Sequence, residues 1–304
     1  PLVSSSAASD VYKRQRFVIV SKRKANVDFY IKNDNSNAKN GDRVVIELIE
    51  WKDTKSPQAK IINILGKPGE NETEIHTILS EYGLNYYFYD QVEKELEKIE
   101  ENISKVEERK REDFRKKTTF TIDPKDAKDF DDAISFDITS EGYEVGIHIA
   151  DVSHYVKPNT KLDTEAYNRG TSVYLVDRVV PMLPEKLSNN ICSLRPKEDK
   201  LTFSAVFTLD INGKILKQKF CRTIINSDYR LSYEEAQHII ENKQEIIPQE
   251  LTIDKKEKKI ERNLIEAITT IHIISKKLRK ERLKKVAILF DKDEIKFLLD
   301  KHKK

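Results

Sequence analysis

The first third of the chain alternates hydrophobic and polar residues in short runs. Such alternation predicts β-strands, because successive side chains of a strand point to opposite faces. Asn40-Gly41 and Pro68-Gly69 mark turns between the runs. Several short strands in so small a segment predict an all-β barrel over residues 16–69. The predicted strands cover residues 17–20, 27–31, 43–51 and 60–65.

A different pattern follows in residues 70–117, which we interpret as a charged helical connector. Residues 74–82 have helical spacing, and residues 91–111 are strongly charged with one narrow apolar stripe. Such a stripe predicts a surface helix that docks on one side and is solvated on the other. We expect no chemistry in this segment. The stripe consists of Val92, Leu96, Ile99, Ile103 and Val106.

Strand-like alternation returns at residue 118 and continues toward the C-terminus. Asn212-Gly213 separates two such runs, and this dipeptide is a strong hairpin signal. Helical spacing covers residues 161–169, 233–242 and 255–285, and an apolar run at 286–290 predicts a late strand. The pattern predicts an α+β domain over residues 118–304, with a mixed, antiparallel-rich sheet and flanking helices.

The first strand of this domain leads into an unusual concentration of carboxylates. Five aspartates fall between residues 123 and 132. Like charges at short range raise one another's pKa, whereas a bound divalent cation stabilises the ionised forms. Oxygen ligands favour Mg²⁺ or Mn²⁺ over Zn²⁺. The pattern predicts a metal site, with an exposed acidic turn as the alternative; the aspartates are Asp123, Asp126, Asp129, Asp131 and Asp132.

A calcium-binding EF-hand loop does not fit this segment. Such a loop needs Gly at its sixth position and Glu at its twelfth. Counting from Asp126, these positions hold Asp131 and Asp137. The loop instead joins two predicted strands, which can hold a metal site rigidly.

The residues of this loop also resemble a known signature. Thr121-Ile-Asp-x5-Asp-Phe-Asp-Asp132 is similar to the catalytic signature of the RNase II/RNase R family of exoribonucleases, whose catalytic domain is the RNB domain. Three more segments, residues 147–156, 168–174 and 181–194, match the family in order. The sequence Arg169-Gly-Thr-Ser-Val-Tyr174 resembles that of RNase R more than that of RNase II. The resemblance extends more weakly from Phe17 to the C-terminus.

The resemblance implies a fold and an activity for each part of the chain. Residues 16–69 would form a cold-shock OB-fold, a class that binds single strands on an aromatic and basic face. Residues 118–304 would form the N-terminal part of an RNB domain. The implied activity is processive, magnesium-dependent hydrolysis of single-stranded RNA from its 3′ end to nucleoside 5′-monophosphates.

Two metal ions could activate water and stabilise the leaving oxygen in such a site. By motif position, Asp123 and Asp132 would bind the metal nearest the scissile phosphate. Asp129 and Asp131 would complete the site by holding the second metal or its water, and Asp131 is expected to be the most sensitive residue. Asp126 occupies a variable position of the family and is assigned no role.

Two aromatic residues match RNA-stacking positions of the family. Tyr174 would stack near the 3′ end of the substrate, and Phe290 would form a second clamp, although its apolar neighbours also fit a core strand. Stacking tolerates any base, which suits an enzyme that degrades arbitrary RNA. In the barrel, Phe29 and Tyr30 face opposite sides of one strand, so either could contact RNA while the other packs in the core.

Composition narrows the possible location and partners. The formal net charge of +3, with 35% charged residues, does not indicate a wholly basic nucleic-acid protein. The two cysteines have neither zinc-site spacing nor a disulfide framework, which favours a reducing cytoplasm. No apolar run approaches the roughly 18 residues of a membrane span. We expect a monomeric, cytoplasmic protein.

The ends of the chain predict a fragment of a longer protein. Residues 1–15 are rich in Ser and Ala, without hydrophobic periodicity, and we interpret them as a non-native or disordered extension. The resemblance implies further active-site residues and an OB-fold beyond residue 304, so the fragment itself is expected to be inactive. The alternatives are a non-catalytic RNA-binding module with an inactive nuclease domain and a DNA nuclease, since only the 2′-hydroxyl separates RNA from DNA.

Overall fold

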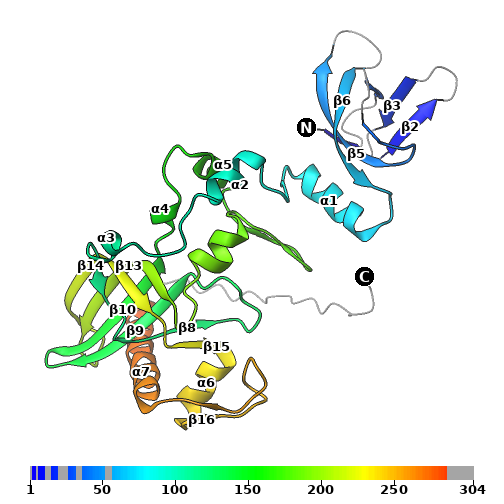
Figure 1. The fold of residues 1–304 in the computed structure, drawn as a ribbon. Coiled ribbons are helices and arrows are strands. Elements are labelled where there is room, and N and C mark those ends of the chain that lie inside the picture. The colour runs from blue at the N-terminus through cyan, green and yellow to red at the C-terminus, as the bar shows by residue number, and fades with distance from the viewer. Residues whose placement is uncertain are drawn as a thin grey trace. The chain divides into compact units, whose positions relative to one another are not determined.

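The computed structural model divides the chain into two compact units, each described here by itself (Figure 1). It describes residues 2–4, 6–10, 15–19, 27–31, 36–51 and 57–285. The first unit contains Pro1–Tyr89 and Arg169–Met182, and the second contains Asp90–Asn168 and Leu183–Ile295. The boundary at residue 89 falls inside the segment predicted as a single connector, so the two units share that segment.

The first unit is built on a six-stranded sheet in the order β1-β5-β6-β4-β3-β2. All its strand pairs are antiparallel except β4 with β6. Val18, Phe29, Val44 and Ile46 are completely buried in its core. The all-β prediction is confirmed. The strands are β1 (Leu2–Ser4), β2 (Ser6–Asp10), β3 (Gln15–Ile19), β4 (Phe29–Ile31), β5 (Arg43–Glu50) and β6 (Gln58–Gly66).

The alternation of β4 separates its two aromatic residues. Phe29 is the core residue, whereas the ring of Tyr30 is only partly buried and lies 5.7 Å from the ring of Phe17. Strands β1 and β2 fall inside residues 1–15 and pair with β5 and β3. The interpretation of this segment as a non-native extension concerns its origin and stays a prediction.

The prediction of one continuous surface helix over residues 91–111 is wrong. Two shorter helices, α2 (Asp90–Leu96) and α3 (Lys105–Glu108), occupy this range. Val92 and Leu96 of α2 are buried, whereas Val106 of α3 is exposed. Ser104 starts α3 by accepting a hydrogen bond from the backbone N–H of Glu107, and such a cap favours a new helix start over continuation. Helix α1 (Asn71–Glu81) belongs to the first unit.

The second unit contains a seven-stranded sheet in the order β15-β8-β9-β10-β13-β14-β7. Its central pairs are antiparallel, while β15 with β8 and β14 with β7 are parallel. The predicted mixed, antiparallel-rich sheet is therefore confirmed, and Asn212-Gly213 forms the hairpin between β13 and β14. The strands are β7 (Glu112–Asp113), β8 (Thr118–Asp123), β9 (Asp132–Thr139), β10 (Gly142–Ala150), β13 (Asp199–Leu209), β14 (Ile215–Asn226) and β15 (Tyr229–Ser232).

Helices α6 (Tyr233–Asn242) and α7 (Arg262–Lys284) share an apolar core with this sheet. The core includes Phe120, Phe136, Leu231 and Leu264. Helix α7 begins later than predicted, because Lys258–Lys259 forms strand β17 and pairs with β16 (Ile246–Ile247). Within the described residues, no helix combines the length and apolar character needed to cross a membrane.

Short elements complete the fold. Helix α4 (Val152–Tyr155) follows β10, and helix α5 (Lys161–Arg169) occupies the predicted helical range. Strands β11 (Val173–Tyr174) and β12 (Val179–Val180) form a hairpin, and a π-helix covers Lys186–Ile191.

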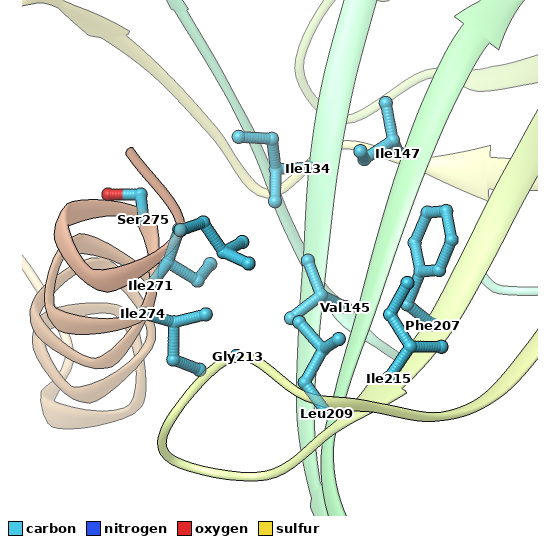
Figure 2. A pocket seen from close by; sticks show the side chains of 11 residues that line it. Ile134, Val145, Ile147, Phe207, Leu209, Gly213, Ile215, Ile271, Ile274 and Ser275 are labelled. Carbon is cyan, nitrogen blue, oxygen red and sulfur yellow. The ribbon is translucent and has the colours of Figure 1, made fainter. Parts of the chain in front are cut away.

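An apolar cavity of about 280 Å³ lies between α7 and strands β9, β10, β13 and β14. Figure 2 shows the side chains that line it. None of its lining residues has a titratable side chain, so the cavity cannot itself supply acid, base or metal chemistry. The lining residues are Ile134, Val145, Ile147, Phe207, Leu209, Gly213, Ile215, Ile271, Ile274, Ser275 and Leu278. Chemistry in this unit must be sought on its polar loops.

Candidate active site

The aspartate loop, residues 123–132, joins two neighbouring strands of the central sheet. Asp123 is the last residue of β8 and Asp132 the first of β9. The predicted placement of the aspartates between two strands is confirmed. Their antiparallel pairing, with Phe120 opposite Ile134, keeps the ends of the loop in adjacent strands. Asp123 and Asp129 are half-buried, whereas the other three aspartates are exposed.

The second half of this loop is held by main-chain contacts. Phe130 is buried; its N–H donates to Ser193 Oγ over 3.0 Å, and its carbonyl accepts from the Leu194 N–H over 2.8 Å. The carbonyl of Asp131 accepts a hydrogen bond from the Ala150 N–H over 2.9 Å. The segments around residues 150 and 194, matched as separate motifs in the sequence, therefore meet at this loop.

Electrostatic coupling connects the aspartates. Burial, and then the negative charges of Asp132 and Asp129, raise the pKa of Asp123. Its Oδ2 atom is buried and has no hydrogen-bond partner. Desolvation by the surrounding protein, and then the charges of Asp129 and Asp132, raise the pKa of Asp131, although its side chain reaches solvent. The negative charges of Asp129 and Asp132 thus act on both Asp123 and Asp131 across one short loop.

A hard divalent cation fits the chemistry of this donor set. It would supply the partner that Asp123 Oδ2 lacks and would reverse the repulsion. Within the part of the chain that the structure describes, however, no three His, Cys, Asp or Glu side chains are gathered in an arrangement that could hold a metal ion. The metal-ligand roles of Asp123, Asp129, Asp131 and Asp132 therefore stay a prediction.

Of the two predicted RNA-stacking residues, only Tyr174 lies within the described part of the chain. Tyr174 ends strand β11 in the first unit, and its side chain is 67% exposed. Its role in stacking stays a prediction. Phe290, together with the predicted late strand 286–290, lies outside the described residues.

The hairpin that carries Tyr174 associates with helix α1, a contact that the sequence did not reveal. Arg178 forms two hydrogen bonds of 2.7 Å with the Glu72 carboxylate. Arg169, which precedes the hairpin, donates to the carbonyl oxygens of Asn85 and Tyr87. These partners lie more than eighty positions away along the chain, and no local pattern indicates such pairing.

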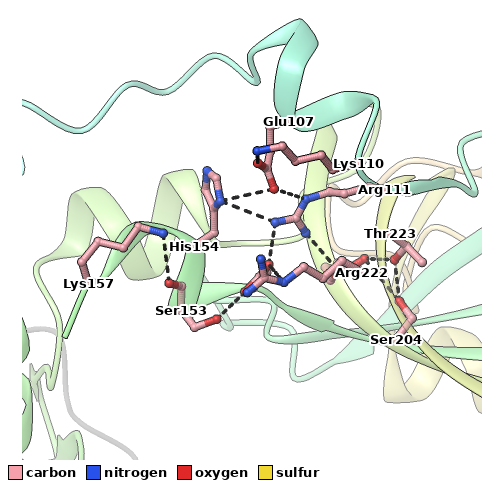
Figure 3. Close-up of polar contacts among 11 residues, drawn as sticks. Glu107, Lys110, Arg111, Ser153, His154, Lys157, Ser204, Arg222 and Thr223 are labelled. Carbon is pink, nitrogen blue, oxygen red and sulfur yellow. Dashed lines mark hydrogen bonds and ion pairs between the residues drawn. The ribbon is translucent and has the colours of Figure 1, made fainter.

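A buried polar cluster, missed in the sequence, lies at the end of β10 (Figure 3). The side chain of Arg111 is 0% exposed and donates to Asp151 Oδ2 over 2.6 Å, Glu107 Oε1 over 2.8 Å and the Thr202 carbonyl over 3.2 Å. Burial opposes ionisation of Asp151, but hydrogen bonds from Ser153 and Arg111 outweigh it and lower its pKa. Because Asp151 follows Ala150, the cluster supports the strand end that binds the Asp131 carbonyl.

His148, on β10 near Asp151, is held in the core by hydrogen bonds. His148 is completely buried, and its ring nitrogens contact Ser204 Oγ at 2.6 Å and Ser135 Oγ at 2.8 Å. Burial lowers the pKa of His148 to about 4, so the ring is neutral. Arg195 forms a surface ion pair with Glu198 over 3.0 Å.

Family models match both parts of the chain. The RNB domain model matches residues 111–304, and the cold shock domain model matches residues 17–88. The cold-shock match therefore runs beyond residue 69, where we expected the barrel to end, and the RNB match begins before residue 118.

Individual relatives agree with these matches. Ribonuclease R of Aquifex aeolicus is 38% identical over 273 residues, which cover 89% of this chain and 37% of the relative. The structure of Mycoplasma genitalium RNase R in complex with double-stranded RNA has a TM-score of 0.82 at 23% identity, covering 99% of this chain and 52% of that one. Yeast Ssd1, a pseudonuclease, has a TM-score of 0.64 at 17% identity, covering 93% of this chain and 34% of that one.

This chain spans about a third to a half of the length of these proteins. Its predicted order, a cold-shock domain followed by an RNB domain, agrees with both family matches. Because the RNB model matches more than half of its residues and curated relatives named ribonuclease R align along most of its length, the chain belongs to the RNB domain family.

Proposed function

We propose that this chain carries the aspartate site of a magnesium-dependent 3′→5′ exoribonuclease that degrades single-stranded RNA processively to nucleoside 5′-monophosphates. The observation that carries the proposal is the set of four carboxylates on the β8–β9 loop of an RNB domain. Asp123 Oδ2, buried without a partner, is the atom most in need of a cation. Manganese would suit the same oxygen donors.

The proposed roles follow the positions of the carboxylates. Asp123 and Asp132, at the two strand ends, would hold the metal nearest the scissile phosphate. Asp129 and Asp131 would hold the second metal or orient its water, and Asp131 is the more accessible of the two. When bound, the metals would lower the pKa of the attacking water and neutralise the leaving 3′ oxygen. The strands provide the rigid support that such a site needs.

Aromatic side chains support RNA as the substrate class. Tyr174 is exposed, and the partly buried rings of Phe17 and Tyr30 lie 5.7 Å apart on neighbouring strands of the cold-shock sheet. Stacking of bases on such rings contributes about 1–3 kcal/mol per base and does not depend on sequence. The Mycoplasma genitalium relative was solved with RNA, which agrees with this assignment.

A non-catalytic RNA-binding module is the second candidate. It is favoured by the likeness to the yeast pseudonuclease, since the two folds agree over 93% of this chain. Fold alone therefore does not decide between the candidates. The presence of all four predicted ligand carboxylates favours the enzyme, because a binding module has no need to hold like charges together.

The deciding experiment incubates the full-length product of the gene with 5′-labelled single-stranded RNA, in magnesium and in EDTA. Three forms are compared, the wild type, Asp131→Asn and Asp126→Asn, the last being a matched change in the same loop. We expect stepwise shortening from the 3′ end only with magnesium, its loss in Asp131→Asn and its retention in Asp126→Asn. RNA binding by the wild type without shortening would favour the module, and full activity of Asp131→Asn would refute the site.

A further inference from the structure

One arginine contacts the aspartate loop from a neighbouring strand. Arg230 lies on β15, which pairs in parallel with β8 so that Arg230 is opposite Thr121 and Ser232 is opposite Asp123. Its Nη2 donates to three carbonyl groups within four residues of the loop. The acceptors are the carbonyl oxygens of Pro124 at 3.4 Å, Lys125 at 2.8 Å and Ala127 at 3.1 Å.

The same guanidinium also contacts the far half of the loop. Its carbon lies 4.8 Å from the centre of the Phe130 ring, within the range of a cation–π contact. Phe130 is itself fixed by Ser193 and Leu194. Arg230 therefore connects the turn after Asp123 to the residue between Asp129 and Asp131. A planar, permanently charged group is suited to this double contact, and a lysine would not reproduce it.

Hydrogen bonds and strand pairing hold the backbone of Arg230 in place. Its carbonyl accepts a hydrogen bond from Lys258 Nζ over 2.9 Å, and Lys258 pairs with the buried carboxylate of Glu235. Glu235 and Ser232 form a reciprocal capping box that fixes the start of α6 directly after β15. The backbone of Arg230 is thus held by the pairing of β15 with β8 and by the helix cap at the C-terminal end of β15.

The hydrogen bonds from Arg230 are a large share of the described main-chain contacts in the first half of the loop. Within residues 124–129, the backbone hydrogen bond from the Ala127 N–H to the Pro124 carbonyl is accompanied by the three bonds from Arg230. Hydrogen bonds from a charged donor are about twice as strong as neutral ones. Removal of Arg230 would leave three carbonyls without this donor beside mutually repelling carboxylates.

We infer that Arg230 is a positioning residue that holds the aspartate loop in the backbone conformation seen in the structure, and so sets where its carboxylates lie. Arg230 does not itself touch substrate in this assignment. The inference rests on the proposed function for its consequence, metal affinity, but the restraint on the loop can be measured without metal or RNA.

The test uses the 304-residue chain and three variants: Arg230→Gln, Arg230→Lys and the control Arg262→Gln. Arg262 is 89% exposed and, in the described contacts, pairs only with Glu245. Arg262→Gln is therefore the same chemical change at an arginine that has no described contact with the aspartate loop. Amide hydrogen exchange, read by mass spectrometry of peptides covering residues 124–131, reports the loop. Calorimetric titration with Mn²⁺ reports the carboxylates.

In Arg230→Gln we expect the hydrogen-bonded amides of Ala127 and Phe130 to exchange at least about tenfold faster, because the loop carbonyls lose a charged donor and the loop opens more often, while amides of β9 and β10 keep their rates. Manganese affinity should fall about 10- to 100-fold, the usual effect of losing a group that orients metal ligands. Arg230→Lys should show the same effects at smaller size, and Arg262→Gln should match the wild type.

The outcomes separate this inference from the proposed function. Faster loop exchange in the Arg230 variants, with no manganese binding even by the wild type, would support the restraint and count against the metal site. Unchanged loop exchange in both Arg230 variants would overturn the inference whatever the metal does. Loss of the folded state in both, detected by circular dichroism, would also overturn it, because Arg230 would then serve overall stability.

Discussion

Replacing Arg111 by methionine should destabilise the second unit far more than replacing any exposed arginine. Arg111 is 0% exposed and its partner Asp151 is 2% exposed, so neither charge can be compensated by water. The change would leave Asp151 buried with its hydrogen bond from Ser153 and the longer contact of 3.7 Å to Arg222. Removing one partner of a buried ion pair costs about 3–5 kcal/mol, against a total stability of about 5–15 kcal/mol.

Arg115 provides a matched control. It also contacts three carboxylates, those of Glu108, Asp113 and Asp199, but its side chain is 30% exposed. Solvent screens such pairs, so Arg115→Met should cost only about 1 kcal/mol. A double variant, Arg111→Met with Asp151→Leu, should be more stable than Arg111→Met alone, because it removes the buried Asp151 charge, whereas Glu107 is 15% exposed and keeps Lys110 within 3.9 Å.

The assay is urea unfolding followed by far-ultraviolet circular dichroism. Trp51 is the only tryptophan and lies in the first unit, so its fluorescence gives an internal control that should not move. The reasoning would be refuted if Arg111→Met lost no more stability than Arg115→Met. It would also be refuted if the double variant were less stable than the single one.

Three further changes test other parts of the structure. The pKa of His148 is 6.5 in the unfolded chain and about 4 in the folded protein. As the pH falls, the unfolded chain therefore binds a proton before the folded protein does. The free energy of unfolding should have its full value above pH 6.5 and decrease by about 3 kcal/mol toward pH 4. Denaturant unfolding at several pH values should show this slope, and His148→Asn should flatten it; an equal slope in the variant would contradict the assignment. Gly146→Ala would place a methyl group 2.4 Å from Ser135 Oγ and 2.6 Å from His148 Nε2, so the thermal midpoint should drop, and adding Ser135→Ala should recover part of the loss. Tyr174→Ala should weaken binding of the chain to single-stranded RNA by roughly 5- to 150-fold for loss of one stacked base, equally for oligo(A) and oligo(U) in fluorescence anisotropy, whereas unchanged affinity would remove Tyr174 from the RNA path.

Local patterns determined much of what the sequence revealed about this protein. Strands β8, β9 and β10 were predictable because a half-buried strand alternates with period two, and the β13–β14 hairpin because Asn-Gly suits its turn. The spacing of the aspartates placed them on one loop and predicted oxygen-ligand chemistry there. Four motifs in a fixed order then predicted the RNB family, which the comparisons confirm.

Only the tertiary structure decided how distant segments support this loop. Arg230 contacts Lys125 across 105 positions, and Arg111 contacts Thr202 across 91 positions. The split between α2 and α3, and the strand β17 in place of the expected start of α7, likewise follow from a cap and from pairing with β16. Propensity and periodicity act over a few residues, whereas these contacts depend on which surfaces meet after the chain has folded, so the sequence specified the chemical groups of the candidate site and the fold selected the residues that hold them.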